Sequence, residues 1–82
     1  MAREIRKASK LLTDTLAANL RRHRRKHQLS QEGLAERCGL HRTYIGSVER
    51  GERNVTLSSL EVMASALGLS VPELLTTGND GD

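Results

Sequence analysis

The side chains that could act as nucleophiles, general bases or metal ligands are few and isolated. The sequence has a single cysteine, Cys38, which cannot form an internal disulfide, and three scattered histidines, His23, His27 and His41. Together they offer no metal-ligand spacing, and no Ser-His-Asp set, carboxylate pair or phosphate loop is recognisable. The pattern therefore predicts a protein that is not an enzyme and needs no metal or other cofactor. Cys38 is expected to be a small buried apolar group.

Positively charged side chains are abundant, and they are concentrated at one end of the chain. Residues 1–28 hold nine Lys or Arg against two acidic residues, giving +7, whereas residues 29–53 are balanced and residues 54–82 carry −4. These three values sum to the net charge of +3. A basic half joined to an acidic half indicates a polyanionic partner, either a nucleic acid or an anionic membrane surface.

The composition predicts that short helices position these charges within one small domain. A chain of 82 residues has no room for a second core. Thirteen leucines with only four valines and two isoleucines favour helices over strands. The longest apolar runs are two or three residues, too short for a membrane span or a signal peptide. We expect a cytoplasmic protein.

Five helices and no strand are predicted. The apolar period predicts a first helix over about 13–26, capped by Thr13 or Asp14. Residues 1–12 then form a basic arm or an extension of that helix, and residues 76–82 form a disordered tail, so the domain spans 13–75. The other helices are expected over about 31–37, over 42–50, from Thr56 or Ser58 to Leu67, and over 71–75.

Capping residues support these boundaries. Ser30 can cap the second helix, and Gly39 supplies a left-handed residue at its end. Gly51 and Gly68 are expected to end the third and fourth helices. Two capping boxes are expected, one formed by Ser58 with Glu61 and the other by Ser70 with Glu73.

One segment has the spacing of a helix-turn-helix, and it reads QEGLAERCGLHRTYIGSVER over residues 31–50. Ala35 is small where the second helix must approach the first closely, and Gly39 lies at the turn. The shared apolar seam is predicted to consist of Leu34, Leu40, Ile45 and Val48.

This segment lies within a longer stretch that resembles the phage repressor and Cro (Xre-like) helix-turn-helix family. The resemblance covers about residues 13–75 and is carried by LSQEGLAERCGLHRTYIGSVERGERNVTLSSLEVMASALGLSVPELL. Within that family, HRTYIGSVERGERN looks most like the controller proteins of restriction-modification systems. The resemblance implies an all-α, compact five-helix bundle of the lambda-repressor type. It also implies a sequence-specific regulator of transcription, which is an activator, a repressor or both according to occupancy. One departure is Gly33, where the family commonly has glutamate.

The resemblance also implies roles for individual residues. The second helix of the motif enters the major groove, and its residues that face base edges here are Arg42, Thr43 and Ser47. Backbone contacts are implied for a further set, Gln31, Tyr44, Arg50, Arg53 and Asn54. Arg24 is paired with Glu49 as a buried structural ion pair, which leaves Arg21 and Arg25 as phosphate neighbours. The alternative for each arginine is a solvated surface charge.

The fourth and fifth helices are predicted to form a dimer interface. At 100° per residue, one side of the fourth helix can fill the core with Leu57, Leu60, Met63, Ala64 and Leu67. Val62 and Ala66 point the other way, flanked by small serines, and the patch can be extended by Leu69, Val71, Leu74 or Leu75. A two-fold dimer of this kind would bind a palindromic operator in double-stranded DNA.

Two other classes of protein compete with this hypothesis. A membrane-surface protein would use the basic first helix, but that helix has no Trp or Phe and needs its apolar stripe for the core. A DNA-binding antitoxin would need a segment to wrap its toxin, and the spare residues are only about 1–12 and 76–82. No membrane partner and no small-molecule ligand are expected.

Overall fold

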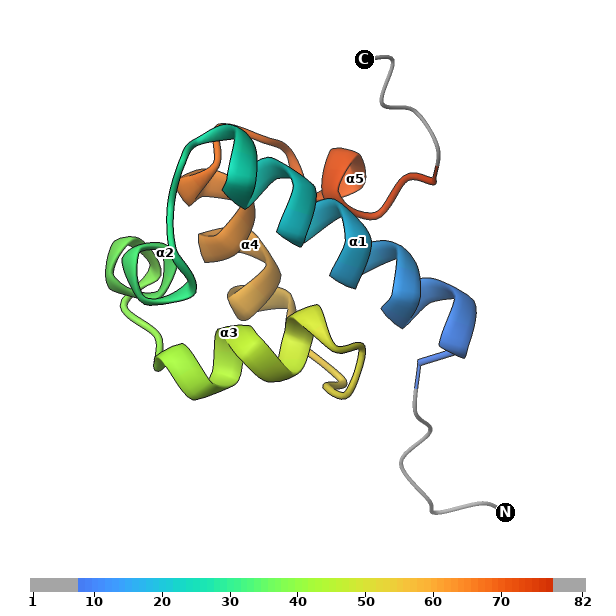
Figure 1. Cartoon of the computed structure of the whole chain (residues 1–82). Coiled ribbons are helices and arrows are strands. Elements are labelled where there is room, and N and C mark those ends of the chain that lie inside the picture. The colour runs from blue at the N-terminus through green and yellow to red at the C-terminus, as the bar shows by residue number, and fades with distance from the viewer. Residues whose placement is uncertain (1–7, 78–82) are drawn as a thin grey trace.

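The computed structural model describes residues 8–77, and all of its regular structure is helical (Figure 1). The helices are α1 (Lys10–Lys26), α2 (Gln31–Cys38), α3 (Arg42–Glu49), α4 (Leu57–Ala66) and α5 (Val71–Leu74). No strand occurs within residues 8–77, so the all-α prediction of five helices is confirmed. Residues 1–7 of the expected arm and 78–82 of the expected tail lie outside the described part.

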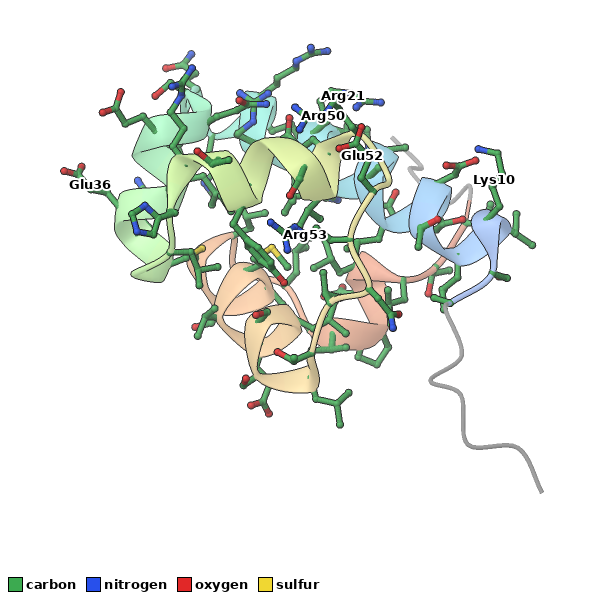
Figure 2. The ribbon with its side chains drawn as sticks, turned by 90° about the horizontal axis from the view of Figure 1, so that it is seen from below. Lys10, Arg21, Glu36, Arg50, Glu52 and Arg53 are labelled. Atoms are coloured by element: carbon green, nitrogen blue, oxygen red, sulfur yellow. The ribbon has the colours of Figure 1, made fainter. Side chains whose placement is uncertain are left out.

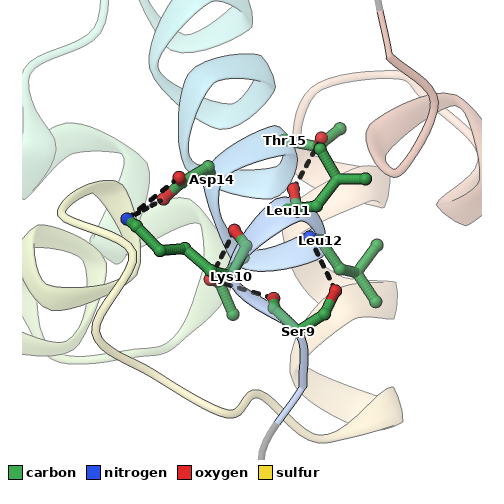
Figure 3. Close-up of polar contacts among 7 residues, drawn as sticks. Ser9, Lys10, Leu11, Leu12, Asp14 and Thr15 are labelled. Atoms are coloured by element: carbon green, nitrogen blue, oxygen red, sulfur yellow. Dashed lines mark hydrogen bonds and ion pairs between the residues drawn. The ribbon is translucent and has the colours of Figure 1, made fainter.

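The first helix begins earlier than predicted. Its N-cap is Ser9, whose Oγ accepts a hydrogen bond from the Leu12 backbone N–H at 3.2 Å (Figure 3). Thr13 is not a cap, because its hydroxyl donates to backbone carbonyls of the turn before it. Asp14 also lies inside the helix, where it pairs with Lys10. Residues 10–12 are therefore an extension of α1, one of the two alternatives that the sequence left open.

The remaining helix ends follow the capping chemistry of the sequence. Ser30, Thr56 and Ser70 each accept a backbone N–H of their own first turn, so Thr56 rather than Ser58 caps α4. The capping box of Ser70 with Glu73 is present. Left-handed glycines follow α2, α3 and α4 at Gly39, Gly51 and Gly68.

The core lies between α1, the α2–α3 pair and the α4–α5 pair (Figure 1). The most deeply buried large side chains come from all five helices and are Leu20, Leu34, Ile45, Val48, Met63 and Leu74. Leu57 was expected in this core but is 79 % exposed, because it is the first residue of α4 and lies beyond the elements that cover the later turns. Cys38 is half-buried rather than buried. Leu40 of the predicted seam is also half-buried.

Two negative findings apply to residues 8–77. None of the helices is both long enough and apolar enough to cross a membrane. No group of three or more His, Cys, Asp or Glu side chains is arranged to hold a metal ion within the same range.

Candidate nucleic-acid interface

The joint between α2 and α3 leaves the start of α3 open to solvent. Ala35 is buried at the joint, and its carbonyl accepts the Leu40 N–H at 3.0 Å as the chain leaves Gly39. The N-cap of α3 is His41, whose side chain makes no capping hydrogen bond. Arg42 and Thr43 follow and are exposed, and Arg42 forms no ion pair with any residue from 8 to 77. The first turn of α3 thus presents one free guanidinium and one hydroxyl.

The far end of α3 is held against α1 by a buried ion pair. Arg24 Nε donates to Glu49 Oε2 at 2.6 Å and Nη2 donates to Oε1 at 3.0 Å, which is a bidentate arrangement. The remaining Arg24 nitrogen donates to the Leu29 carbonyl at 2.8 Å. Because both side chains are fully bonded and nearly inaccessible, they fix the distance and the rotation of α3 relative to α1.

The ionised state of Glu49 is stabilised by its neighbours. Burial by itself opposes ionisation, but hydrogen bonds from Arg24 and Gln31 outweigh it, so the pKa of Glu49 lies below its ordinary value. The same hydrogen bond raises the pKa of Arg24. The two groups therefore remain charged together at neutral pH.

Gln31 joins this network, which changes the role open to its side chain. Its Nε2 donates to Glu49 Oε1 at 3.0 Å. One of the two N–H donors of this amide is thereby occupied, and the free backbone N–H groups at the start of α2 still favour an anion. Sequence reasoning missed this link between α2 and α3.

The two arginines of α1 that were expected near phosphates differ in their surroundings. Arg21 Nη1 donates to the Glu49 backbone carbonyl at 2.8 Å, so Arg21 also binds the C-terminal end of α3. Arg25 is exposed and forms no ion pair within residues 8–77. Arg21 is thus partly structural, and Arg25 is the freer cation.

An open hollow of about 200 Å³ lies between the start of α2 and the length of α3, and it is lined by Gln31, Arg42, Thr43, Gly46 and Arg50. Gly46 forms its floor: a Cβ there would lie 3.4 Å from both Arg50 Nη1 and Gln31 Oε1. The glycine therefore makes room for these two side chains beside α3. The hollow combines two guanidinium groups with a hydroxyl and an amide oxygen, which suits a negatively charged and hydrogen-bonding ligand.

Ser47 is not available to read bases, contrary to the expectation above. The residue is 6 % exposed, and its hydroxyl donates to the Tyr44 carbonyl at 2.8 Å and accepts Arg53 Nε at 2.9 Å. The chain reverses at Gly51, where φ is +74°, and so brings Arg53 back across this side of α3. Arg53 also lies over the Tyr44 ring, with its Cζ 5.1 Å from the ring centroid.

The loop after α3 carries two further polar contacts. Asn54 Oδ1 accepts the Ala8 backbone N–H at 3.2 Å, so the start of the described chain lies beside this loop. Arg50 Nε lies 3.1 Å from Glu52 Oε2 in an exposed ion pair. Figure 2 looks onto α3 and shows Arg50, Glu52 and Arg21 close together near its end. The sequence analysis did not predict the pairing of Glu52 with Arg50. The one feature that indicates this pair in the sequence is an acidic residue two positions after an arginine, with a glycine between them.

A comparison with protein families decides the classification of this fold. Residues 20–74 match the model of the helix-turn-helix family HTH_3, and this range contains the last seven residues of α1 and all of α2 to α5. The chain belongs to this helix-turn-helix family.

Similar helix-turn-helix proteins include restriction-modification regulators. The chain is 63 % identical over 65 residues to the control protein C.SmaI of Serratia marcescens, covering 79 % of this chain and 77 % of that protein. The crystal structure of the restriction-modification controller protein C.AhdI from Aeromonas hydrophila matches with 44 % identity and a TM-score of 0.73, covering 76 % of this chain and 94 % of that one. The structure of the hypothetical transcription factor NHTF from Neisseria matches with 41 % identity and a TM-score of 0.78, covering 92 % and 87 %.

The residues predicted to form a dimer interface lie on α4, on α5 and in the turns that follow these two helices. Val62 is 38 % exposed, and four other predicted members are half-buried and pack against the core, namely Ala66, Leu69, Val71 and Leu75. Leu74 does not belong to the patch: it is 0 % exposed, because α5 turns this residue inward against the core. Five of the six predicted members are thus exposed or half-buried, and their role in a dimer stays a prediction.

Proposed function

We propose that this chain is a sequence-specific DNA-binding regulator of transcription, the controller of a restriction-modification operon, acting in the bacterial cytoplasm without enzymatic activity. The observation that carries the proposal is the exposed start of α3, where Arg42 and Thr43 open into a hollow with a second guanidinium from Arg50. The family membership and the names of the relatives support the same assignment.

In this proposal α3 lies in the major groove and its first turn reads base edges. Arg42 can donate two hydrogen bonds to guanine O6 and N7, and Thr43 can offer its methyl group to thymine or its hydroxyl to a base. Both side chains are exposed, whereas the side chain of Ser47 is engaged within the protein. Base reading is therefore assigned to Arg42 and Thr43 alone.

The surrounding cations are assigned to the DNA backbone. Arg53 is held by a hydroxyl and an aromatic ring, which orient its guanidinium without neutralising its charge. The same role is assigned to Tyr44, Arg50, Asn54, Arg21 and Arg25, and the backbone N–H groups at Gln31 complete the set. Such contacts position the protein on the duplex but carry no sequence information.

We further propose a two-fold dimer through Val62, Ala66, Leu69, Val71 and Leu75. The patch lies on the acidic half of the chain, which leaves the basic half free for DNA. A two-fold dimer would present two copies of α3 to half-sites about 34 Å apart, so the operator should be an imperfect palindrome.

Two arginine variants test the separation of reading from positioning. On the duplex selected from a random library, Arg42→Ala should lose roughly 1–3 kcal/mol of binding free energy and relax the preference at one base pair. Arg53→Ala should weaken binding to selected and scrambled duplexes alike and lower the slope of log K against log salt by about 1. Equal losses on both duplexes for Arg42→Ala would assign base reading to another residue. Wild-type binding without salt dependence would refute the DNA proposal and favour a protein partner.

The dimer is tested separately. Val62→Glu should shift sedimentation toward the monomer and weaken operator binding while the helical circular dichroism is unchanged. A wild-type chain that stays monomeric at concentrations of tens of micromolar, and binds a half-site as tightly as the full site, would contradict the dimer.

A further inference from the structure

Two arginines in the loop after α3 are held by partners of different charge. Arg53 Nε donates to the Ser47 hydroxyl at 2.9 Å, and its guanidinium lies over the Tyr44 ring. Both partners are neutral, so Arg53 keeps its positive charge available. Arg50 Nε lies instead 3.1 Å from a carboxylate oxygen of Glu52, which offsets the charge of Arg50.

The backbone brings Glu52 to this position. Gly51 adopts a φ of +74° and reverses the chain, and the Glu52 N–H donates to the Ser47 carbonyl at 3.0 Å. Residue 52 is thereby fixed at the end of α3 beside Arg50, as Figure 2 shows. The backbone of Glu52 is therefore held against α3 by this hydrogen bond.

Glu52 lies between the two cationic parts of the face. Arg50 lines the hollow that contains Arg42 and Thr43, whereas Glu52 lines a second hollow of about 350 Å³ together with Arg53 and Asn54. The side chains of Arg50 and Glu52 are 59 % and 56 % exposed. An exposed pair of this kind contributes little to stability, so Arg50 can exchange the carboxylate for another anion at small cost.

We propose that Glu52 competes with DNA phosphate for Arg50 and so lowers the affinity of the chain for DNA of any sequence. This inference rests on the proposed DNA-binding function. The carboxylate and a phosphate oxygen are both acceptors for the same guanidinium, so binding of one displaces the other. The consequence is a weaker phosphate contribution, which shortens the time spent on the large excess of non-specific sites that a regulator meets.

The test compares two charge-matched variants. Glu52→Gln removes the competing charge and keeps the size of the side chain. Glu36→Gln removes the same charge from an exposed position on α2 that Figure 2 shows at the edge of the molecule, away from Arg50. Binding is measured by fluorescence anisotropy over a salt series, with the duplex selected from a random library and with a scrambled duplex.

Glu52→Gln should bind both duplexes roughly two- to fivefold more tightly than Glu36→Gln does. Its salt slope should be steeper by up to about 0.9, the contribution of one phosphate contact. In an Arg50→Ala background the Glu52→Gln substitution should bring no further gain, because the guanidinium for which the anions compete is absent.

Three outcomes would overturn the inference while leaving the proposed function intact. The first is equal binding by the Glu52→Gln and Glu36→Gln variants. The second is weaker binding by Glu52→Gln, which would mean that the carboxylate orients Arg50 for DNA. The third is a full gain in the Arg50→Ala background, which would assign the effect to direct repulsion of DNA by Glu52. A wild-type chain that binds neither duplex would overturn the proposed function together with this inference.

Discussion

The first helix contacts α3 and α5 by two different means (Figure 1). Toward α3 it uses the charged network in which Arg24 donates twice to Glu49. Toward α5 and the residues that follow it, α1 uses neutral hydrogen bonds, because Asn19 Nδ2 donates to the carbonyls of Leu74 and Thr76 at 2.8 and 2.9 Å. The Leu74 side chain is fully buried.

The two contacts therefore have different effects: one orients α3, and the other attaches α5 to the core. A bidentate ion pair is directional and tolerates little rotation, so it fixes how α3 presents its exposed first turn. Apolar burial is non-directional and holds α5 in place without the same angular constraint. The contact with α5 also contains two ionisable groups, His23 and Glu73, but they form no ion pair within residues 8–77. Because the ion pair between α1 and α3 is buried, the contact with α3 should respond more strongly to acid.

The largest effects are expected from breaking the charged contact. Arg24→Ala and Glu49→Ala should each lower the free energy of unfolding by roughly 3–5 kcal/mol, because each leaves the other charge buried and unpaired. The double mutant should cost much less than the sum of the two. Urea unfolding of all four proteins measures this coupling, and additive losses below about 0.5 kcal/mol would show two independent surface charges.

The same contact predicts an acid-labile component of stability. The pKa of Glu49 is lower in the folded chain than the ordinary value of about 4.3 that applies when the chain is unfolded. Its contribution is therefore complete above about pH 4.3 and is lost as the pH falls through the lower folded-state value. Glu49→Gln should flatten the stability profile between about pH 5 and pH 2. An unchanged profile would assign acid unfolding to other carboxyl groups.

The apolar contact should be costly to break but independent of pH. Leu74→Ala removes a fully buried side chain and should lower stability by roughly 2–5 kcal/mol at neutral and acidic pH alike. Leu75→Ala, at the half-buried neighbouring position, is the matched control and should cost less. Equal losses for the two variants would contradict the assignment of Leu74 to the core.

The neutral hydrogen bonds between α1 and α5 should contribute less. Asn19→Ala leaves two backbone carbonyls without this hydrogen-bond donor. It also removes the side-chain oxygen that accepts a hydrogen bond from Arg22 Nη1 at 3.1 Å. We expect a loss of roughly 1–3 kcal/mol in urea unfolding, with binding to DNA retained at temperatures where the variant is folded. A selective loss of DNA binding in a fully folded variant would show that α5 also influences the orientation of α3.

The smallest effect on stability is expected from an exposed ion pair at the start of α1. Lys10 and Asp14 are 3.1 Å apart at i and i+4, but their side chains are 86 % and 53 % exposed. Lys10→Ala should change stability by less than about 0.5 kcal/mol, and the change should decrease with added salt. A loss above 1 kcal/mol would mean that the start of α1 is held by more than this pair.

The sequence predicted the elements best where caps and periodicity agreed. Ser30, Gly39 and the Ser70–Glu73 box marked the ends of α2 and the start of α5 within about one residue. The predicted start of α1 was wrong, because Ser9, Thr13 and Asp14 are all residue types that can cap a helix. Ser9 is the cap because the helix is already continuous from Lys10 onward. No glycine marks the other end of α1, where Gln28 adopts a φ of +57°.

The sequence by itself determined the helical class, the charge asymmetry and the helix-turn-helix spacing, because these depend on local propensity, capping and residue order. Only the tertiary structure decided which side chains of the motif are available. Ser47 and Arg42 both belong to α3, yet the chain reversal at Gly51 engages the hydroxyl of Ser47 and leaves Arg42 exposed. The reversal also placed Glu52 against Arg50. Side-chain availability depends on which distant segment packs back on a helix, and that information is absent from the periodicity of the helix itself.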